Sequence, residues 1–165
     1  MQYQFCPKCG GNLKEVFEGE YPRLRCSKCG FIFYQNSKPC VTPVIVDGDK
    51  VLLGRRAHDP AKGAWDLLGG FLEVGEHPED GLRRELREET GLEVRKVELL
   101  GIFMDKYPDY NYDTLNIAYL CSVQGEMKAN DDAAELKWFP LNNLPDLFFK
   151  NANETIEALK LYLKK

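Results

Sequence analysis

The sequence lacks any apolar run long enough to cross a membrane, and it contains no repeat or low-complexity tract. A transmembrane helix needs about 18 or more apolar residues in succession, and no such run occurs in this chain of 165 residues. The first residues, 1–6, have neither the basic nor the apolar segment of a secretory signal peptide. We therefore expect a cytoplasmic protein with no membrane partner.

An excess of positive charge is also missing. The 22 lysines and arginines are outnumbered by 26 aspartates and glutamates, which gives a formal net charge of −4. Proteins that bind nucleic acid usually have a basic face, so this balance argues against DNA or RNA as a partner of the whole chain. The length fits one ordinary domain, or a small domain with a tiny appended module.

Four of the six cysteines form two closely spaced pairs near the N-terminus. Each pair has the spacing C-x2-C, and four thiolates satisfy the tetrahedral preference of Zn²⁺. Because four thiolates also close the coordination shell, the pattern predicts a structural zinc site. Two disulfides or an iron centre would use the same residues, but disulfides are rare in the cytoplasm. The predicted zinc ligands are Cys6, Cys9, Cys26 and Cys29.

The remaining two cysteines, Cys40 and Cys121, lie in strand-like sequence and are expected in the core, where free cysteine is common. A polar segment that ends at Pro39 separates the cysteine-rich part from sequence rich in β-branched residues. We therefore expect a small zinc ribbon at residues 1–38 and a second domain at residues 39–165.

Turn and capping signals outline the elements of the second domain. A hairpin is expected around the turn at Gly48, and Pro43 predicts an edge position or a bulge in its first strand. A final helix is expected to begin at an Asn153 cap, with Ile156, Leu159 and Leu163 on its apolar face. Strands are expected at residues 41–46, 51–53, 94–104 and 115–123.

A helix with strong end signals is predicted at residues 78–90. Pro78 suits its first position and Gly91 its C-terminal cap. Within this predicted helix, three glutamates stand at positions i, i+3 and i+4, a spacing that puts their carboxylates on one helical face. Such like charges repel, and a hard divalent cation would remove the repulsion. The three glutamates are Glu85, Glu88 and Glu89.

An acidic segment by itself would indicate an ordinary solvated helix, but the residues around this one form a longer pattern. Residues 70–92 resemble the Nudix box, G-x5-E-x7-R-E-U-x-E-E-x-G-U with U aliphatic, at every defined position. Residues 65–70 and 138–145 also resemble segments of that family. The resemblance implies an α/β fold, the Nudix α/β/α sandwich with a mixed β-sheet. It also implies a hydrolase that cleaves a phosphoanhydride bond with Mg²⁺ or Mn²⁺.

The resemblance assigns the metal site to the matched residues. Glu85, Glu88 and Glu89 would bind the metal, and one of them would act as general base. The carbonyl oxygen of Gly70 would add a ligand.

Two further assignments come from the same resemblance. Glu76 and Arg84 would form a structural pair that pins the loop between them. A later loop of the family often supplies another acid to the metal site, and Asp132 and Glu135 are both candidates here.

The substrate is suggested by the order of the two domains. A zinc ribbon directly ahead of a Nudix domain resembles the NADH pyrophosphatase branch of the family. The motif S-Q-P-W-P-F-P of that branch is absent, because the corresponding residues 101–108 read G-I-F-M-D-K-Y-P. ADP-ribose or a related ADP-sugar is therefore the favoured substrate, with NAD(H) as the alternative.

Several side chains are candidates for contacts with such a nucleotide, and each also fits a solvated surface. Tyrosine rings can stack on a base, and arginine or lysine can meet phosphate oxygens. Carboxylates can accept hydrogen bonds from ribose hydroxyls. The candidates are Tyr107, Tyr110, Arg55, Arg56, Lys62, Asp105 and Asp113.

A binding module is the competing class of function. Some Nudix-like domains act as nucleotide sensors, and zinc ribbons often bind nucleic acid or protein. The complete set of three glutamates favours an enzyme, because a sensor does not need them. Because the ribbon contains several basic residues, that module alone could still bind an acidic partner. The family resemblance also implies a homodimer.

Overall fold

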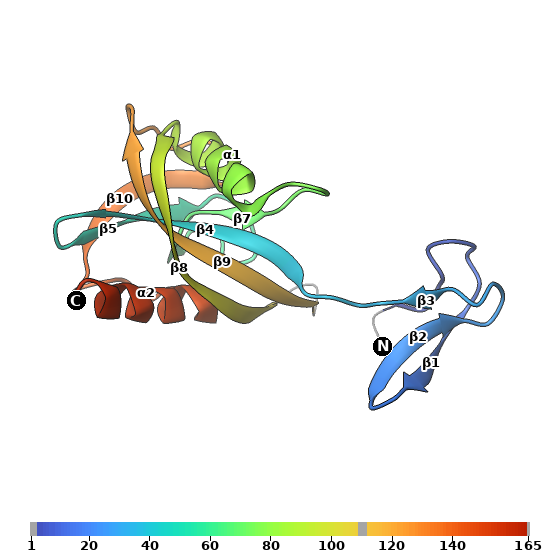
Figure 1. The fold of residues 1–165 in the computed structure, drawn as a ribbon. Helices are drawn as coiled ribbons and strands as arrows, with labels where there is room; N and C mark the ends of the chain where they lie inside the picture. Colours follow the sequence, from blue (N-terminus) through green and yellow to red (C-terminus); the bar gives the residue numbers. More distant parts are fainter. Residues whose placement is uncertain (1–2, 109–111, 165) are drawn as a thin grey trace. The chain divides into compact units, whose positions relative to one another are not determined.

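The computed structural model describes residues 3–108 and 112–164, which belong to two compact units, Met1–Ser37 and Lys38–Lys165. The boundary lies in the polar segment that precedes Pro39. Figure 1 colours the first unit in blue and the second from cyan to red.

The first unit is an antiparallel sheet in the order β1-β2-β3. A backbone hydrogen bond closes the turn at each cysteine pair. The Cys6 N–H donates to the Gly11 carbonyl at 2.7 Å, and the Cys26 N–H donates to the Phe31 carbonyl at 2.8 Å. Leu24 is the only buried hydrophobic residue of this unit, besides cysteine, among the described residues. The strands are β1 (Leu13–Glu18), β2 (Tyr21–Cys26) and β3 (Ile32–Phe33).

The second unit is built on a mixed sheet in the order β10-β5-β4-β9-β8. β4 and β9 are parallel, whereas the other neighbours are antiparallel, and the short strands β6 and β7 pair with β5 and β4. The strands are β4 (Lys38–Asp47), β5 (Lys50–Arg56), β6 (Trp65–Asp66), β7 (Gly70–Phe71), β8 (Glu93–Tyr107), β9 (Tyr112–Gln124) and β10 (Ala133–Pro140). The helices are α1 (Pro78–Thr90) and α2 (Lys150–Tyr162).

The two helices cover opposite faces of this sheet (Figure 1). Alternation along β5 directs neighbouring side chains to the two faces. Leu52 belongs to the same apolar cluster as Leu86 of α1, whereas Leu53 belongs to the cluster that contains Ile156 of α2. The predicted α/β/α sandwich around a mixed sheet is therefore confirmed. No helix in the described part of the chain is long and apolar enough to cross a membrane.

The expected edge position of Pro43 is wrong, because β4 is the central strand of the sheet. The register explains how proline is tolerated there. On one side, β4 pairs continuously with β9; on the other, it pairs with β7 at residues 40–41 and with β5 at residues 46–47. Pro43 lies between the pairings with β7 and β5, where β4 changes partner, so its missing N–H interrupts neither of these two pairings.

The expected start of the last helix is also wrong. α2 begins at Lys150 with Phe149 as its N-cap residue, so Asn153 lies in the first turn. The amide of Asn153 donates to the carbonyls of Leu147 and Phe149 rather than accepting a backbone N–H. Leu163, expected on the apolar face, follows the helix and is half exposed.

Gly69 marks the point at which backbone packing brings β7 close to β4. Its φ is +123°, and a Cβ atom there would collide with the carbonyl oxygen of Val41. Gly48, in the β4–β5 turn, has φ +60° with open space around it. We expect Gly48→Ala to cost about 1 kcal/mol of stability and Gly69→Ala at least roughly 3 kcal/mol, measured by urea denaturation. Equal losses for the two variants would contradict the close backbone approach.

Candidate active site and cysteine cluster

The acidic side chains are presented by α1, whose ends are fixed by local contacts. The imidazole of His77 accepts a backbone N–H of the first turn, Pro78 is the first helical residue, and Gly91 ends the helix in the left-handed conformation. The helix therefore begins and ends where the sequence predicts. The glutamates differ in environment, since Glu89 is only 6% exposed whereas the side chain of Glu88 is 46% exposed.

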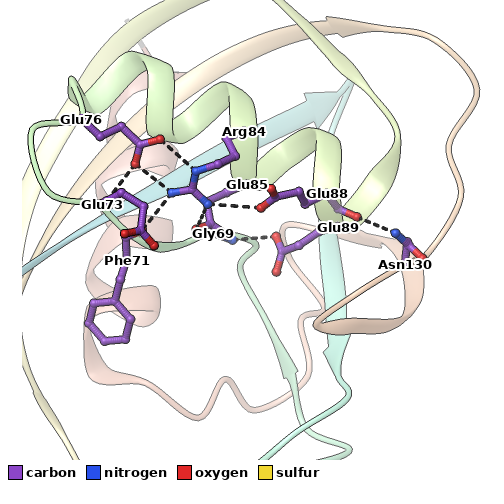
Figure 2. Close-up of polar contacts among 9 residues, drawn as sticks. All are labelled: Gly69, Phe71, Glu73, Glu76, Arg84, Glu85, Glu88, Glu89 and Asn130. Carbon is purple, nitrogen blue, oxygen red and sulfur yellow. Dashed lines mark hydrogen bonds and ion pairs between the residues drawn. The ribbon is translucent and has the colours of Figure 1, made fainter.

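Arg84 joins the acidic face of α1 to the loop that precedes the helix (Figure 2). Its Nε and NH2 groups donate to the two carboxylate oxygens of Glu76, each at 2.8 Å. NH1 donates to Glu85 at 2.7 Å and to Glu88 at 3.2 Å. NH2 also donates to the carbonyl of Phe71 at 3.1 Å. One guanidinium therefore holds three carboxylates and the end of β7.

The two-hydrogen-bond contact between Arg84 and Glu76 changes the pKa of both groups. Hydrogen bonds from Arg84, and then from the Glu73 N–H, lower the pKa of Glu76 to about 2. The same contact raises the pKa of Arg84 above its ordinary value. Glu76 is therefore ionised throughout the physiological range and fixes the loop of residues 73–76 to α1.

Glu89 is the most deeply buried acid of the group. Burial raises its pKa to about 8, against the effect of the Gly69 N–H, which donates to its carboxylate at 2.9 Å. The charges of Glu85 and Asp132 raise the pKa further. A buried carboxyl group among other acids is costly to ionise unless a cation lies nearby.

Glu85 lies against the backbone of β7. Burial raises its pKa, whereas the hydrogen bond and charge of Arg84 lower it. A Cβ atom at Gly70 would lie 2.5 Å from a carboxylate oxygen of Glu85. A larger residue at position 70 would therefore displace this carboxylate from its place beside β7.

The two later acids lie in different surroundings. Asp132 lines a cavity together with Glu89 and Gly69, and its charge raises the pKa of both Glu85 and Glu89. Both acids lie near a basic side chain at the surface, Asp132 at 3.7 Å from His58 and Glu135 at 3.6 Å from Arg55, but only Asp132 also lines this cavity. The structure therefore brings Asp132, and not Glu135, to the glutamates of α1.

A larger cavity adjoins this acidic group, and it shares Gly69 and Asp132 with the smaller one. It opens between β4, β7 and the start of α2, and its lining combines polar and aromatic side chains. The lining includes Thr42, Arg56, Asp66, Gly70, Phe71, Tyr107, Thr114, Asn116, Asp132, Phe149 and Asn151.

Aromatic rings dominate one side of the larger cavity. Tyr107 stacks on Phe149 with ring centroids 5.8 Å apart and lies 5.7 Å from the ring of Phe71. The guanidinium of Arg56 lies over the Phe149 ring at 5.2 Å, and its Nε donates to the Pro60 carbonyl at 2.7 Å. The cavity therefore joins flat apolar surfaces and a fixed positive charge to a group of carboxylates.

The other candidates for substrate contacts do not line this cavity. The side chain of Arg55 points to the carbonyl of Gly63, and Lys62 is exposed. Asp105 accepts the Asn151 N–H at the start of α2, and Asp113 is exposed on β9. Tyr110 lies outside the described residues. Of these predicted contacts, the structure brings Arg56 and Tyr107 to the cavity.

Sequence reasoning missed several lining residues, among them Asp66, Phe149 and Asn151. Asp66 accepts the N–H groups of Leu67 and Phe149 at 2.8 and 3.4 Å, and burial raises its pKa to about 6. Asp66 stands in the segment at residues 65–70 that resembles the family, so that segment carried a signal. Phe149 and Asn151 precede and begin a helix that was expected to start later, and no sequence signal indicated them.

The four predicted zinc ligands form one cluster. Their Sγ atoms all lie within 4.8 Å of one another, with 3.8 Å from Cys6 to Cys29 and 3.6 Å from Cys9 to Cys26. A tetrahedral site with metal–sulfur distances of about 2.3 Å places sulfurs roughly 3.8 Å apart, so the cluster fits a zinc ion. Cys40 and Cys121 are buried in the second unit, as expected. Within the described residues, no other group of three or more His, Cys, Asp or Glu lies so close together.

Comparison with known families agrees with both units. The model described as NUDIX domain matches residues 37–161, and the Nudix zinc-ribbon model, described as Nudix N-terminal, matches residues 4–35. The chain belongs to the Nudix family and carries its N-terminal zinc-ribbon module.

Curated relatives fall into two groups. The chain is 40% identical over 117 residues to an "ADP-ribose pyrophosphatase" of Methanocaldococcus jannaschii, covering 70% of this chain and 69% of the relative. It is 28% identical over 146 residues to the "NAD-capped RNA hydrolase NudC" of Vibrio atlanticus, covering 87% of this chain and 52% of the relative. The chain thus spans about half the length of the second relative.

Solved structures share the fold. A NUDIX hydrolase from Nitrosomonas europaea has a TM-score of 0.74 and 27% identity, covering 98% of this chain and 91% of that one. A bifunctional NMN adenylyltransferase/ADP ribose pyrophosphatase from Francisella tularensis, complexed with AMP and a manganese ion, has a TM-score of 0.62 and 25% identity. It covers 80% of this chain and 43% of that one.

The contact between Glu76 and Arg84 predicts a specific dependence of stability on pH. Because the pKa of Glu76 is lowered to about 2 in the folded state, its contribution is complete above its unfolded pKa of about 4.5 and is lost as the pH falls towards 2. We expect the stability difference between wild type and Glu76→Gln to be largest at pH 5 and above. It should shrink steadily towards pH 2 in urea denaturation. A difference independent of pH would contradict the ionised contact.

Proposed function

We propose that the chain hydrolyses the phosphoanhydride bond of ADP-ribose or a related ADP-sugar with the help of Mg²⁺ or Mn²⁺. The observation that carries the proposal is the pair of largely buried carboxylates, Glu85 and Glu89, beside the aromatic cavity. Burial and mutual repulsion raise the pKa of both Glu85 and Glu89, so a divalent cation would stabilise their ionised forms.

Glu85, Glu88 and Glu89 would hold the cation, with Asp132 as the further acid and the Gly70 carbonyl as an added ligand. Oxygen donors of this kind suit both Mg²⁺ and Mn²⁺. When bound, such a cation neutralises charge on the phosphates and favours ionisation of a water molecule. One of the glutamates would also accept the proton of that water.

The chain's own contacts position these donors. One nitrogen of Arg84 donates hydrogen bonds to Glu85 and Glu88. Its other nitrogens donate to Glu76 and to the end of β7. It can release the two glutamates to a cation and remain fixed by Glu76. Arg84 is therefore a positioning residue, which keeps the acidic face of α1 ordered.

The larger cavity suits the nucleotide part of the substrate. A purine base could stack on the rings of Phe71, Tyr107 or Phe149, because aromatic faces attract one another in offset or tilted arrangements. Arg56 carries the fixed positive charge that a diphosphate requires. Two of the similar proteins are named ADP-ribose pyrophosphatases, which supports this substrate class.

A dinucleotide such as NAD(H), free or at the end of an RNA, is the second candidate. It is favoured by the similarity to the NAD-capped RNA hydrolases, which covers 87% of this chain and must therefore extend into the ribbon. Both candidates contain an AMP group joined through a diphosphate, so the same carboxylates would serve either reaction.

The ribbon would bind one Zn²⁺ through its four cysteines. Two backbone N–H groups, of Cys29 and Lys28, point at the Cys26 sulfur and lower its pKa to about 6, which favours the thiolate that zinc requires. With Leu24 as the only other buried hydrophobic residue of the described ribbon, metal binding would supply much of its stability. Homodimer formation and a cytoplasmic location stay predictions.

The first prediction on activity concerns the glutamates of α1. We expect Glu88→Gln and Glu89→Gln each to lower the Mg²⁺-dependent release of AMP from ADP-ribose on the order of 100-fold or more, because an amide is a weaker ligand and no base. Mass spectrometry of the products measures the rate.

Glu135→Gln is the matched control, because Glu135 follows the same loop but pairs with Arg55 away from the cavity. Its activity should stay within about twofold of wild type, whereas Asp132→Asn should be impaired. Normal turnover in both Glu88→Gln and Glu89→Gln would refute the assignment of the metal site.

The zinc assignment is tested by metal analysis. We expect one zinc ion per purified wild-type chain and a loss of that zinc in Cys26→Ser, because the hydroxyl of serine is a far poorer zinc ligand than a thiolate. Cys121→Ala, which removes a buried cysteine of the second unit, should retain the zinc. Iron in place of zinc, or a metal-free ribbon with two disulfides, would contradict the assignment.

A further inference from the structure

One face of the ribbon sheet gathers cationic and aromatic side chains. Cross-strand partners in an antiparallel sheet lie on the same face, and side chains alternate between faces along each strand. Arg25 is paired with Lys14, and Arg23 is paired with Val16. Tyr21, two residues before Arg23, therefore lies on the same face. We call this face, with Lys14, Tyr21, Arg23, Arg25 and Tyr34, the basic–aromatic face.

Arg23 links the aromatic rings of this face. Its guanidinium lies 5.5 Å from the ring centre of Tyr21 and 5.3 Å from that of Tyr34, which brings Tyr34 onto the same face. The Tyr34 hydroxyl donates to Glu18 at 3.4 Å, and Glu18 is paired with Tyr21 across the strands. These contacts hold the two rings in place, although Tyr21 is 64% and Tyr34 is 55% exposed.

The opposite face of the same sheet has a different composition. Phe17, paired with Pro22, lies there and is 70% exposed, and the only charged residue on that side of the paired positions is Glu15. The ribbon therefore offers aromatic rings on both faces but combines them with positive charge on one.

The charge of the chain is divided unequally between the two units. Residues 1–37 contain five lysines and arginines and three glutamates, which gives a net charge of +2. Since the whole chain carries −4, residues 38–165 carry −6. A polyanion would therefore be attracted to the ribbon and repelled by much of the second unit.

We propose that the basic–aromatic face of the ribbon binds single-stranded RNA. Exposed rings stack on unpaired bases, and arginines beside them contact phosphates and the π faces of bases. A duplex hides its base faces, so it could use only the cations. The expectation that nucleic acid is no partner came from the negative net charge of the whole chain, whereas the ribbon by itself carries a net positive charge.

The proposal extends the function of the chain without depending on it. If the second unit hydrolyses a nucleotide at the end of an RNA, the ribbon would raise the local concentration of that end. The similarity to NAD-capped RNA hydrolases agrees with such a substrate. Binding by the ribbon and hydrolysis by the acidic unit can nevertheless be measured separately.

The test measures binding of a fluorescent, uncapped single-stranded RNA of about 12 nucleotides to the full chain by anisotropy, in buffer without Mg²⁺. We expect binding at about 50 mM salt that weakens steeply as salt rises, with a slope of log affinity against log salt near −2 for three cations. Tyr34→Ala should weaken binding about fivefold or more. A duplex of the same length should bind more weakly.

The controls separate the face from the rest of the ribbon. Tyr34→Phe keeps the ring, and Phe17→Ala removes a ring from the opposite face, so both should bind within about twofold of wild type. Arg25→Ala should reduce the salt slope by about 0.7, whereas Lys8→Ala, which removes the same charge outside the sheet, should not. Zinc content and circular dichroism verify that each variant is folded, and Arg25→Ala carries the test if Tyr34→Ala unfolds.

Three results would overturn the proposal. Wild type could fail to bind the RNA at about 50 mM salt. Phe17→Ala could weaken binding as much as Tyr34→Ala does. Finally, Tyr34→Ala could convert a dimer to a monomer in size-exclusion chromatography with RNA binding unchanged, which would assign the face to a second copy of the chain. If wild type hydrolysed none of the diphosphate-linked substrates, the proposed enzyme would be refuted but the binding face would not.

Discussion

The contacts of one guanidinium, that of Arg84, hold the acidic site together. It is the element that ties the loop of residues 73–76, the end of β7 and the acidic face of α1 to one another (Figure 2). Without Arg84, Glu85 and Glu88 would lose the guanidinium that both of them contact. The repulsion between these neighbouring carboxylates would then drive them apart. The fork shape matters, because an ammonium group offers no planar pair of donors to Glu76.

Backbone packing supplies the second requirement of the site. Gly69 allows β7 to approach the carbonyl of Val41, and Gly70 leaves room for the carboxylate of Glu85. The Gly69 N–H then reaches Glu89, which is otherwise shielded from water. The acids are thus held by the sandwich itself, whereas the ribbon has little apolar core and depends on its cysteine cluster.

Much of this architecture was predictable where the signals are local. The cap and end residues of α1, the turn at Gly48 and the spacing of the four cysteines depend on neighbours in the sequence, and all three agree with the structure. The missed features depend on distant pairings. Pro43 is tolerated where β4 changes partner beside it. Asp132, which precedes β10, lines the cavity beside Glu89, whereas Glu135 lies within β10 and pairs with Arg55.

The central claim is that the carboxylates of α1 support metal-dependent cleavage of a diphosphate. The most direct test is a mass-spectrometric panel in Mg²⁺ or Mn²⁺ buffer that contains ADP-ribose, NAD, NADH, NAD-capped RNA and nucleoside triphosphates. The account predicts metal-dependent release of AMP, or of RNA with a 5′-monophosphate, from at least one diphosphate-linked substrate, with ADP-ribose favoured, and none from the triphosphates. No product from any diphosphate-linked substrate, with folded protein and bound metal, would contradict it.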